Sequence, residues 1–339
     1  MVPLTHFRQF GFADVAAAGM QPFDAWLAEA RRITGEDRPY GLFADPAEAY
    51  PWAKALWVLV FPYAAFEKYP PDCMQIPGYN FSSHACYGAL DALAKSLQSF
   101  GIRAERATLL PHKSIALRTG KGHYGKNGLF YWPPYGSRVV LGVLVVDSDA
   151  LTSAAFPTDP QKTTASGTDA VGSTCGAERI SDADGTSNAC GTCNGNASAD
   201  TARNANAASN ADTACTTYAA CGACDRCAKA CPTGALDGTG VVGPNCLRHF
   251  FPDPLPAHLK EKMGLRGIGC DTCQLVCPQN PRQTAPLPAD YAELFHIPTL
   301  RQASEEQLKQ LCARMAPFIG TNLARPAKIR DAAMGCTLK

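Results

Sequence analysis

The sequence carries almost no net charge, no long apolar run and no sign of an export signal. Its 31 Lys and Arg residues nearly balance 30 Asp and Glu residues, for a net charge of +1, so bulk charge does not predict binding to nucleic acid or to acidic membranes. The longest apolar stretch, residues 55–66, contains Pro62 and is too short to span a bilayer. The first residues lack a charged segment followed by an apolar one. We therefore expect a cytoplasmic protein without a membrane partner.

Large apolar residues are nearly missing between residues 152 and 217, where only Phe156, Val171 and Ile180 occur. Such a segment cannot bury enough apolar surface to offset its chain entropy, so we predict a disordered insertion. It contains a C-x-x-C pair that could form a third metal site. The cysteines of this segment are Cys175, Cys190, Cys193 and Cys215.

Cysteine, by contrast, is abundant, and half of the 16 residues lie between residues 221 and 278, seven of them in two runs. The first run, CGACDRCAKACP, has gaps of two, two and three residues before its proline, and the second reads CDTCQLVCP. In bacterial ferredoxins three cysteines of such a run bind one 4Fe–4S cluster and the fourth reaches the other. The spacing thus predicts two clusters. The predicted ligands are Cys221, Cys224, Cys227 and Cys277 for the first, and Cys231, Cys246, Cys270 and Cys273 for the second.

Structural zinc is the alternative interpretation, because paired C-x-x-C units also bind zinc. Zinc needs two pairs per ion, however, and leaves a third and fourth cysteine before a proline unexplained. A disulfide framework is less favoured because nothing in the sequence indicates secretion. The isolated cysteines have no partner at metal-binding spacing and are predicted to be free or buried thiols. They are Cys73, Cys86, Cys312 and Cys336.

Helices and strands alternate in the first half of the chain. Apolar residues at helical spacing predict amphipathic helices at residues 23–30 and 83–100. The continuous apolar run at residues 55–61 predicts a strand buried on both faces, and residues 138–147 predict a second strand. The prolines of residues 69–77 predict a loop. We therefore expect an α+β protein whose N-terminal part is an α/β layer domain.

Near the C-terminus, Ser304 and Gln307 are predicted to form the capping box of a helix that runs to residue 315. The whole chain is predicted to divide into four segments. The segments are an N-terminal α/β domain (1–150), the insertion (151–217), a two-cluster ferredoxin-like domain (218–285) and a C-terminal helical tail (286–339).

A glycine-rich stretch, residues 109–128, reads LLPHKSIALRTGKGHYGKNG and precedes the second strand. Its glycines allow a backbone to approach a ligand closely, although a plain turn between helix and strand would also use them. The stretch is neither a phosphate-binding Walker loop nor a dinucleotide fingerprint, since its lysine lacks a following Ser or Thr and no strand leads into it. It is therefore a candidate binding loop of another kind.

Together, this loop and the cysteine runs resemble the epoxyqueuosine reductase family, which carries a similar G-x-G-x-x-GKN loop ahead of a double-cluster domain. The likeness extends over residues 10–66, 109–147 and 221–280, and GIGCDTCQLVCPQN and the isolated Cys246 are especially similar to the family pattern. The resemblance implies a nitroreductase-like N-terminal domain that binds cobalamin. It also implies two clusters that pass single electrons to the cofactor, which then removes the epoxide oxygen of epoxyqueuosine in tRNA. The cofactor-binding residues implied are Gly122, Gly125, Lys126 and Asn127.

The resemblance further implies an external low-potential electron donor of the flavodoxin or ferredoxin type. The sequence departs from the family pattern where a proton-donating aspartate is expected, because residues 107–110 contain no carboxylate. LPHK replaces the usual P-x-x-E run, and a C-terminal helical-repeat domain, useful for gripping tRNA, is not found up to Lys339. Proton donors are then sought in the loop region. His112 and Tyr124 are the predicted catalytic residues, with Lys113 and Lys126 as further candidates.

Two classes of function compete at this point. The first is a corrinoid-dependent iron–sulfur reductase, and the second is a ferredoxin-type electron-transfer protein whose N-terminal half only docks a partner. A carrier needs little more than the cluster segment, so about 150 further residues with a glycine-rich loop favour the enzyme. A protein that keeps its clusters for stability alone is the third possibility. His84 is interpreted as a residue at a helix start.

Overall fold

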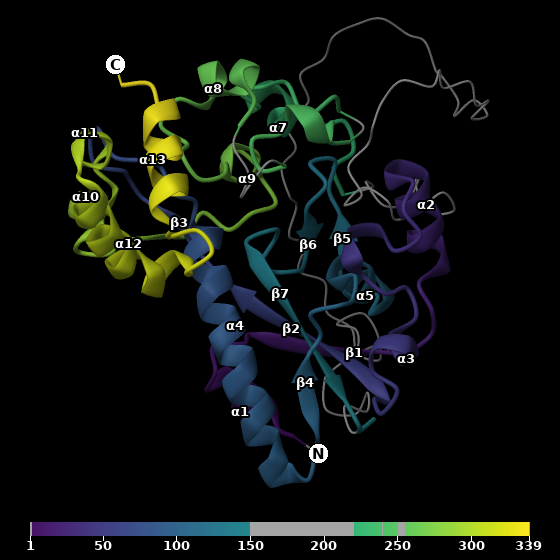
Figure 1. Ribbon diagram of the computed structural model, residues 1–339. Helices are drawn as coiled ribbons and strands as arrows, with labels where there is room; N and C mark the ends of the chain where they lie inside the picture. The colour runs from purple at the N-terminus through teal and green to yellow at the C-terminus, as the bar shows by residue number, and fades with distance from the viewer. Residues whose placement is uncertain (1, 150–219, 239, 250–254, 339) are drawn as a thin grey trace, which may run out of the picture. The chain divides into compact units, whose positions relative to one another are not determined.

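A four-stranded antiparallel sheet organises the N-terminal half of the computed structural model, which describes residues 2–149, 220–238, 240–249 and 255–338 (Figure 1). The strand order is β1-β2-β7-β4. The central pair is in register along its whole length, from Ala55 opposite Val146 to Pro62 opposite Val139. Both predicted strands are therefore confirmed. The bounds are β1 Asp14–Ala18, β2 Ala55–Pro62, β4 Ala104–Arg106 and β7 Val139–Val146.

Helices cover both faces of this sheet, which explains why β2 is apolar at every position from Ala55 to Val60. Leu56, Val58 and Val60 face the core that includes α2 and α5, while the ring of Trp57 meets Phe7 of α1 at 5.9 Å between centroids. Figure 1 shows α4 on one side of the sheet and α2, α3 and α5 on the other. The covering helices are α1 Leu4–Arg8, α2 Asp24–Thr34, α3 Pro46–Ala49, α4 Gly78–Leu97 and α5 His112–Arg118.

The long helix α4 begins five residues earlier than the sequence predicts. Pro77 occupies its N-cap position and Gly78 its first turn, where a Cβ atom would lie 2.7 Å from the carbonyl oxygen of Ala64. His84 therefore lies inside the helix, and its interpretation as a residue at the helix start is wrong. The sequence hides this boundary because glycine, tyrosine, asparagine and serine are weak helix formers.

A second core forms among the C-terminal helices and the loop ahead of α4. The capping box of Ser304 and Gln307 is present, as predicted, at the start of α12. Cys73, Cys312 and Cys336 are buried in this core, so their interpretation as buried thiols is confirmed. The helices are α10 Tyr291–Phe295, α11 Ile297–Gln302, α12 Glu305–Ile319 and α13 Pro326–Gly335.

Short elements connect these two cores through the cluster segment. The strand β3 of the N-terminal half pairs in parallel with β8, which follows the second cysteine run. No described helix has the length and apolar character needed to cross a membrane. The predicted insertion and its four cysteines lie outside the described residues. The remaining elements are β3 Ala65–Phe66, β5 His123–Tyr124, β6 Phe130–Tyr131, α7 Arg226–Ala230, α8 Ala257–Met263, α9 Thr272–Leu275 and β8 Thr284–Ala285, with 3-10 turns at Pro39–Gly41, Gln98–Phe100 and Gly243–Asn245.

Candidate iron–sulfur site

The seven cysteines of the two runs and the isolated Cys246 gather into two sets that line two separate small cavities. The first cavity is lined by Cys221, Cys224, Cys227 and Cys277, and the second by Cys231, Cys246, Cys270 and Cys273. These groups are the same as those predicted from spacing, including the exchange in which Cys277 crosses from the second run to the first set. Helices α7 and α9, which follow Cys224 and Cys270–Asp271, pack against each other and bring the two runs together.

Each set places four cysteines around one cavity. Within the described ranges, no group of three or more Cys, His, Asp or Glu side chains is arranged to hold one metal ion. In a 4Fe–4S cluster each thiolate binds a different iron atom, so the four sulfur atoms stay apart around the cluster. Two sets of four cysteines around two cavities therefore fit two clusters.

The crowding of thiols also fits a cationic occupant. Burial, followed by the charges of Cys270 and Cys246, raises the pKa of Cys273 well above its ordinary value. Burial likewise raises the pKa of Cys227, with contributions from Cys221 and Cys277. Ionising several such neighbours is unfavourable unless iron compensates their charge. Burial opposes ionisation of Cys231 too, but hydrogen bonds from Thr233 and nearby backbone N–H groups outweigh it and lower the pKa of that thiol.

The last part of the predicted binding loop forms β5 and the turn of the β5–β6 hairpin, and side chains of this hairpin face the first cysteine set. Lys126 donates through Nζ to the carbonyl oxygens of Gly222 at 2.6 Å and Cys224 at 3.5 Å. Asn127 is buried and lines both cysteine cavities, and its Nδ2 donates to the Tyr131 hydroxyl at 3.0 Å. Figure 1 shows α7, which contains Cys227 of this set, beside the end of the hairpin. The loop is thus part of the surroundings of the clusters.

The glycines of the loop serve close packing within the hairpin. A Cβ atom on Gly122 would overlap the Phe130 ring and the Tyr131 carbonyl oxygen, and one on Gly125 would overlap the Tyr131 ring. Together with Lys126 and Asn127, these were the residues predicted to bind cobalamin. All four contact protein in this structure, and their assignment to that cofactor stays a prediction.

The two predicted catalytic residues lie away from the cysteine cavities, since neither lines them. The His112 ring contacts the Ala107 carbonyl oxygen through Nε2, and burial lowers the pKa of that imidazole, which keeps it neutral at pH 7. Tyr124 is buried in the sheet core, where its ring meets Phe130 edge to face at 5.5 Å. Their catalytic roles stay predictions.

Lys113 is the most strongly perturbed cation among the proton-donor candidates. Its Nζ donates to the Gly128 carbonyl oxygen at 2.9 Å. Burial, followed by the nearby charge of Arg248, lowers the pKa of Lys113 to about 8. A group with this pKa exchanges protons near neutral pH, as a general acid must.

This pKa predicts a specific pH dependence of stability. Because the folded protein holds the Lys113 proton less tightly than the unfolded chain, the unfolded state binds more protons between pH 8 and 10.5, and the free energy of unfolding rises with pH. Relative to Lys113→Met, the wild type should gain up to about 3 kcal/mol over this interval. Urea unfolding at pH 8 and pH 10 measures the difference. The control Lys95→Met, on the exposed side of α4, should show no such change, and an equal change in both variants would contradict the prediction.

Sequence reasoning missed a buried polar seam between the sheet and the second cysteine run. Asn280 accepts from the backbone N–H of Ser137 at 2.7 Å and donates to the Gln274 carbonyl oxygen at 2.8 Å. Gln274 in turn donates to the Ser137 carbonyl oxygen at 2.8 Å and contacts the Tyr63 hydroxyl. A Cβ atom on Gly136, whose φ is +64°, would overlap Asn280. The only sequence signal was the polar pair QN directly after the last cysteine-proline.

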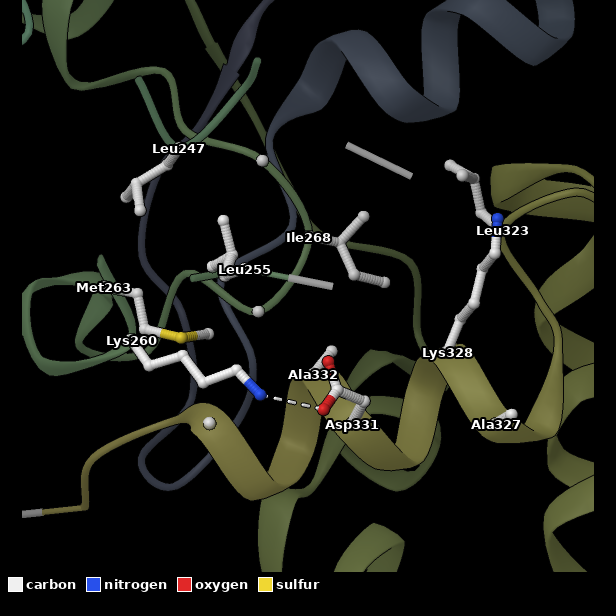
Figure 2. Close-up of a pocket in the computed structure, with 13 residues that line it drawn as sticks. Leu247, Leu255, Lys260, Met263, Ile268, Leu323, Ala327, Lys328, Asp331 and Ala332 are labelled. Atoms are coloured by element: carbon white, nitrogen blue, oxygen red, sulfur yellow. Dashed lines mark hydrogen bonds and ion pairs between the residues drawn. The ribbon is translucent and has the colours of Figure 1, made fainter. Parts of the chain in front are cut away.

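A further cavity of about 390 Å³ lies between α8, α13 and the loop ahead of Cys270 (Figure 2). Its walls are mostly aliphatic, and Leu247 lines both this cavity and that of the second cysteine set. In Figure 2, Lys260 reaches across to Asp331 of α13, with 3.0 Å between Nζ and Oδ1. The second cysteine set therefore has an apolar neighbour on this side.

Comparison with known proteins agrees with this geometry. Residues 220–280 match the family described as a 4Fe-4S double cluster binding domain. The chain is 48% identical over 62 residues to the epoxyqueuosine reductase of Listeria monocytogenes, and 41% identical over 75 residues to that of Burkholderia pseudomallei. These alignments cover 17% and 21% of this chain and only 16% and 18% of the two relatives.

Solved structures extend the likeness to the whole fold. An epoxyqueuosine reductase from Streptococcus thermophilus matches 98% of this chain and 79% of its own chain, with a TM-score of 0.64 and 18% identity. Another epoxyqueuosine reductase, crystallised with a tRNA-Tyr epoxyqueuosine-modified stem loop, matches the same shares with a TM-score of 0.62 and 19% identity. The predicted resemblance and the mixed helix and strand architecture are confirmed, and the double-cluster prediction is supported over zinc.

Proposed function

We propose that this chain is an iron–sulfur reductase, because its fold and its double-cluster segment are similar to those of epoxyqueuosine reductases. Two 4Fe–4S clusters deliver electrons one at a time to an acceptor bound against the N-terminal domain. An external low-potential carrier of the flavodoxin or ferredoxin type supplies the electrons.

The observation that carries this proposal is the continuous junction between the sheet domain and the cluster segment. Lys126 and Tyr131 of the hairpin contact the first cysteine set, and Ser137 ahead of β7 is hydrogen-bonded to Asn280. A carrier that only docks a partner has no use for such a junction. A reductase needs it, because electron transfer requires the acceptor to be held close to a cluster at a constant distance.

We propose an epoxide within a modified tRNA nucleoside as the substrate class, since a relative was crystallised with an epoxyqueuosine-modified stem loop. Two electrons and two protons convert an epoxide to an alkene and water. Two clusters that each pass single electrons can supply the pair. The protein must then supply protons at the departing oxygen.

Lys113 is the proton donor that the contacts support best. His112 is held against a backbone carbonyl with a lowered pKa, Tyr124 is packed in the core, and Lys126 is engaged by the cluster loop. Lys113 combines a pKa of about 8 with a place beside the Gly128 carbonyl oxygen. On this basis the lysine takes the place of the carboxylate that the family pattern contains and residues 107–110 lack.

A corrinoid would supply the two-electron reducing power for such a reaction. The residues predicted to hold it in the glycine-rich loop also contact protein. No step of the proposed reaction is assigned to it, and whether the chain binds it is a separate question. Cob(II)alamin added to the anaerobically reconstituted protein answers it by EPR. A base-off cobalt signal would indicate a bound corrinoid, and an unchanged base-on signal would contradict the prediction.

The proposed reaction is tested with the reduced, two-cluster protein and an epoxyqueuosine-containing tRNA stem loop under anaerobic conditions, with and without cobalamin. Nucleoside mass spectrometry should show that the nucleoside loses one oxygen atom. At pH 7, Lys113→Met should slow this reaction by more than any decrease in the fraction of folded protein accounts for. Clusters that are reoxidised by other acceptors while the nucleoside stays unchanged would overturn the reductase proposal and favour the electron carrier.

A further inference from the structure

The geometry points to a second role for the glycine-rich loop: we propose that the β5–β6 hairpin sets the reduction potential of the cluster held by the first cysteine set, with Tyr131 as the hydrogen-bond donor. The inference needs the clusters but not the proposed reaction, because it concerns the potential of one cluster whatever the final acceptor is. Nothing in the resemblance to known reductases assigns this role to the loop.

The central contact joins the Tyr131 hydroxyl to the Sγ atom of Cys277 at 3.2 Å. A phenol keeps its proton at neutral pH, and a cluster-bound thiolate can only accept, so the hydroxyl is the donor. Reduction adds negative charge to a cluster, and hydrogen bonds to its sulfur atoms stabilise that charge. Because Tyr131 is only 2% exposed, water does not weaken the interaction. The contact therefore raises the reduction potential.

Three neighbours hold the Tyr131 hydroxyl and ring in place. Asn127 donates to the hydroxyl oxygen at 3.0 Å, which polarises the O–H group toward sulfur. The His123 ring is stacked on the Tyr131 ring, with centroids 5.5 Å apart and planes 10° from parallel. Gly125 lies so close to the same ring that no Cβ atom fits there. Asn127 and His123 are thus positioning residues, and the Tyr131 hydroxyl itself is the donor to sulfur.

The same hairpin reaches the first cysteine set a second time. The Nε2 atom of His123 lies 3.2 Å from the Oε1 atom of Gln279. The amide nitrogen of Gln279 donates to the Ala220 carbonyl oxygen at 2.9 Å and lies 3.7 Å from the Sγ atom of Cys221. The sulfur atoms of two of the four cysteines in this set, Cys277 and Cys221, are therefore contacted by Tyr131 itself or by Gln279, which His123 contacts.

The second cysteine set depends on its own loops instead. The hydroxyl groups of Thr272 and Thr233 lie 3.3 Å from Cys270 Sγ and 3.6 Å from Cys231 Sγ, each only two residues from its cysteine. Tyr131 and Cys277, by contrast, are 146 residues apart. Among the residues that the structure describes, a side-chain donor of the N-terminal domain reaches a cysteine sulfur atom in the first set only. The N-terminal domain can therefore change the potential of the first cluster separately from that of the second.

Redox titration of the two-cluster protein, followed by EPR and without any substrate, tests this inference. Tyr131→Phe removes only the hydroxyl, so both clusters should assemble with unchanged iron content. One cluster should become harder to reduce by about tenfold in its equilibrium constant, or about 59 mV for a one-electron couple. Thr272→Val is the matched variant and should shift the other cluster in the same direction, and the double variant should show both shifts.

Asn127→Ala provides a second variant in case Tyr131→Phe lowers cluster content. It should shift the same cluster as Tyr131→Phe, in the same direction and by less, because the donor remains but loses its support. Equal shifts of both clusters, or no shift in either variant, would overturn the role of the hairpin. Since no substrate is present, a failed reductase assay would leave this result intact, and unchanged potentials would leave the reductase proposal intact.

Discussion

Replacing Cys227 with alanine is expected to halve the iron of the protein, from about eight to about four atoms per chain, since each 4Fe–4S cluster needs all of its thiolates. Cys227 lines the first cavity with three other cysteines, and its thiol is crowded by Cys221 and Cys277. Removing one ligand leaves three thiols whose ionisation nothing compensates. Iron and acid-labile sulfide, measured after anaerobic reconstitution, give the count.

Double variants test how the cysteines are grouped. Cys227→Ala with Cys277→Ala affects one set only and should still leave about four iron atoms, whereas Cys227→Ala with Cys273→Ala affects both sets and should leave none. Cys312→Ala is the control, because this thiol is buried in the C-terminal core and should not change the iron content. Zinc in place of iron, or a loss of all iron from the first double variant, would contradict the two-cluster arrangement.

The second large effect is expected at Asn280, the centre of the polar seam between the sheet and the cluster segment. In Asn280→Ala the buried N–H group of Ser137 loses its partner at 2.7 Å, and the Ser137 hydroxyl loses its two contacts with Asn280. An orphaned buried donor costs about 1–3 kcal/mol, so we expect a loss of about 2–3 kcal/mol in the free energy of unfolding. Thermal unfolding at one scan rate, followed by far-UV circular dichroism, should show the lower midpoint.

Asn322→Ala serves as the control for Asn280→Ala. Asn322 is exposed, and its hydrogen bond to Arg325 at 3.0 Å lies at the surface, so its loss should change stability by less than about 0.5 kcal/mol. If both variants unfold at the same temperature, the seam does not hold the cluster segment on the sheet. Loss of the cluster absorbance ahead of the sheet signal in Asn280→Ala would show that the seam protects the clusters first.

Local patterns predicted those features that depend on neighbouring residues. The buried strands β2 and β7 follow from continuous apolar runs, because a strand covered on both faces needs apolar side chains at every position. The capping box at Ser304 follows from two residues three positions apart. The start of α4 did not follow, because Pro77 and the approach of Gly78 to Ala64 decide it against the intrinsic helix propensity.

The candidate site likewise combines features that local patterns predicted with features that they could not predict. Short fixed gaps between cysteines allow only certain thiols to face one cluster, so spacing alone grouped the two cysteine sets and indicated the resemblance to known reductases. The partners of the glycine-rich loop could not be predicted, since Tyr131 and Cys277 are 146 residues apart. A contact over such a separation depends on how the hairpin and the cluster segment pack, and no local pattern encodes that packing. Sequence alone therefore determined which residues can bind the clusters, and only the tertiary structure decided that the loop predicted to hold a cofactor faces the first cysteine set.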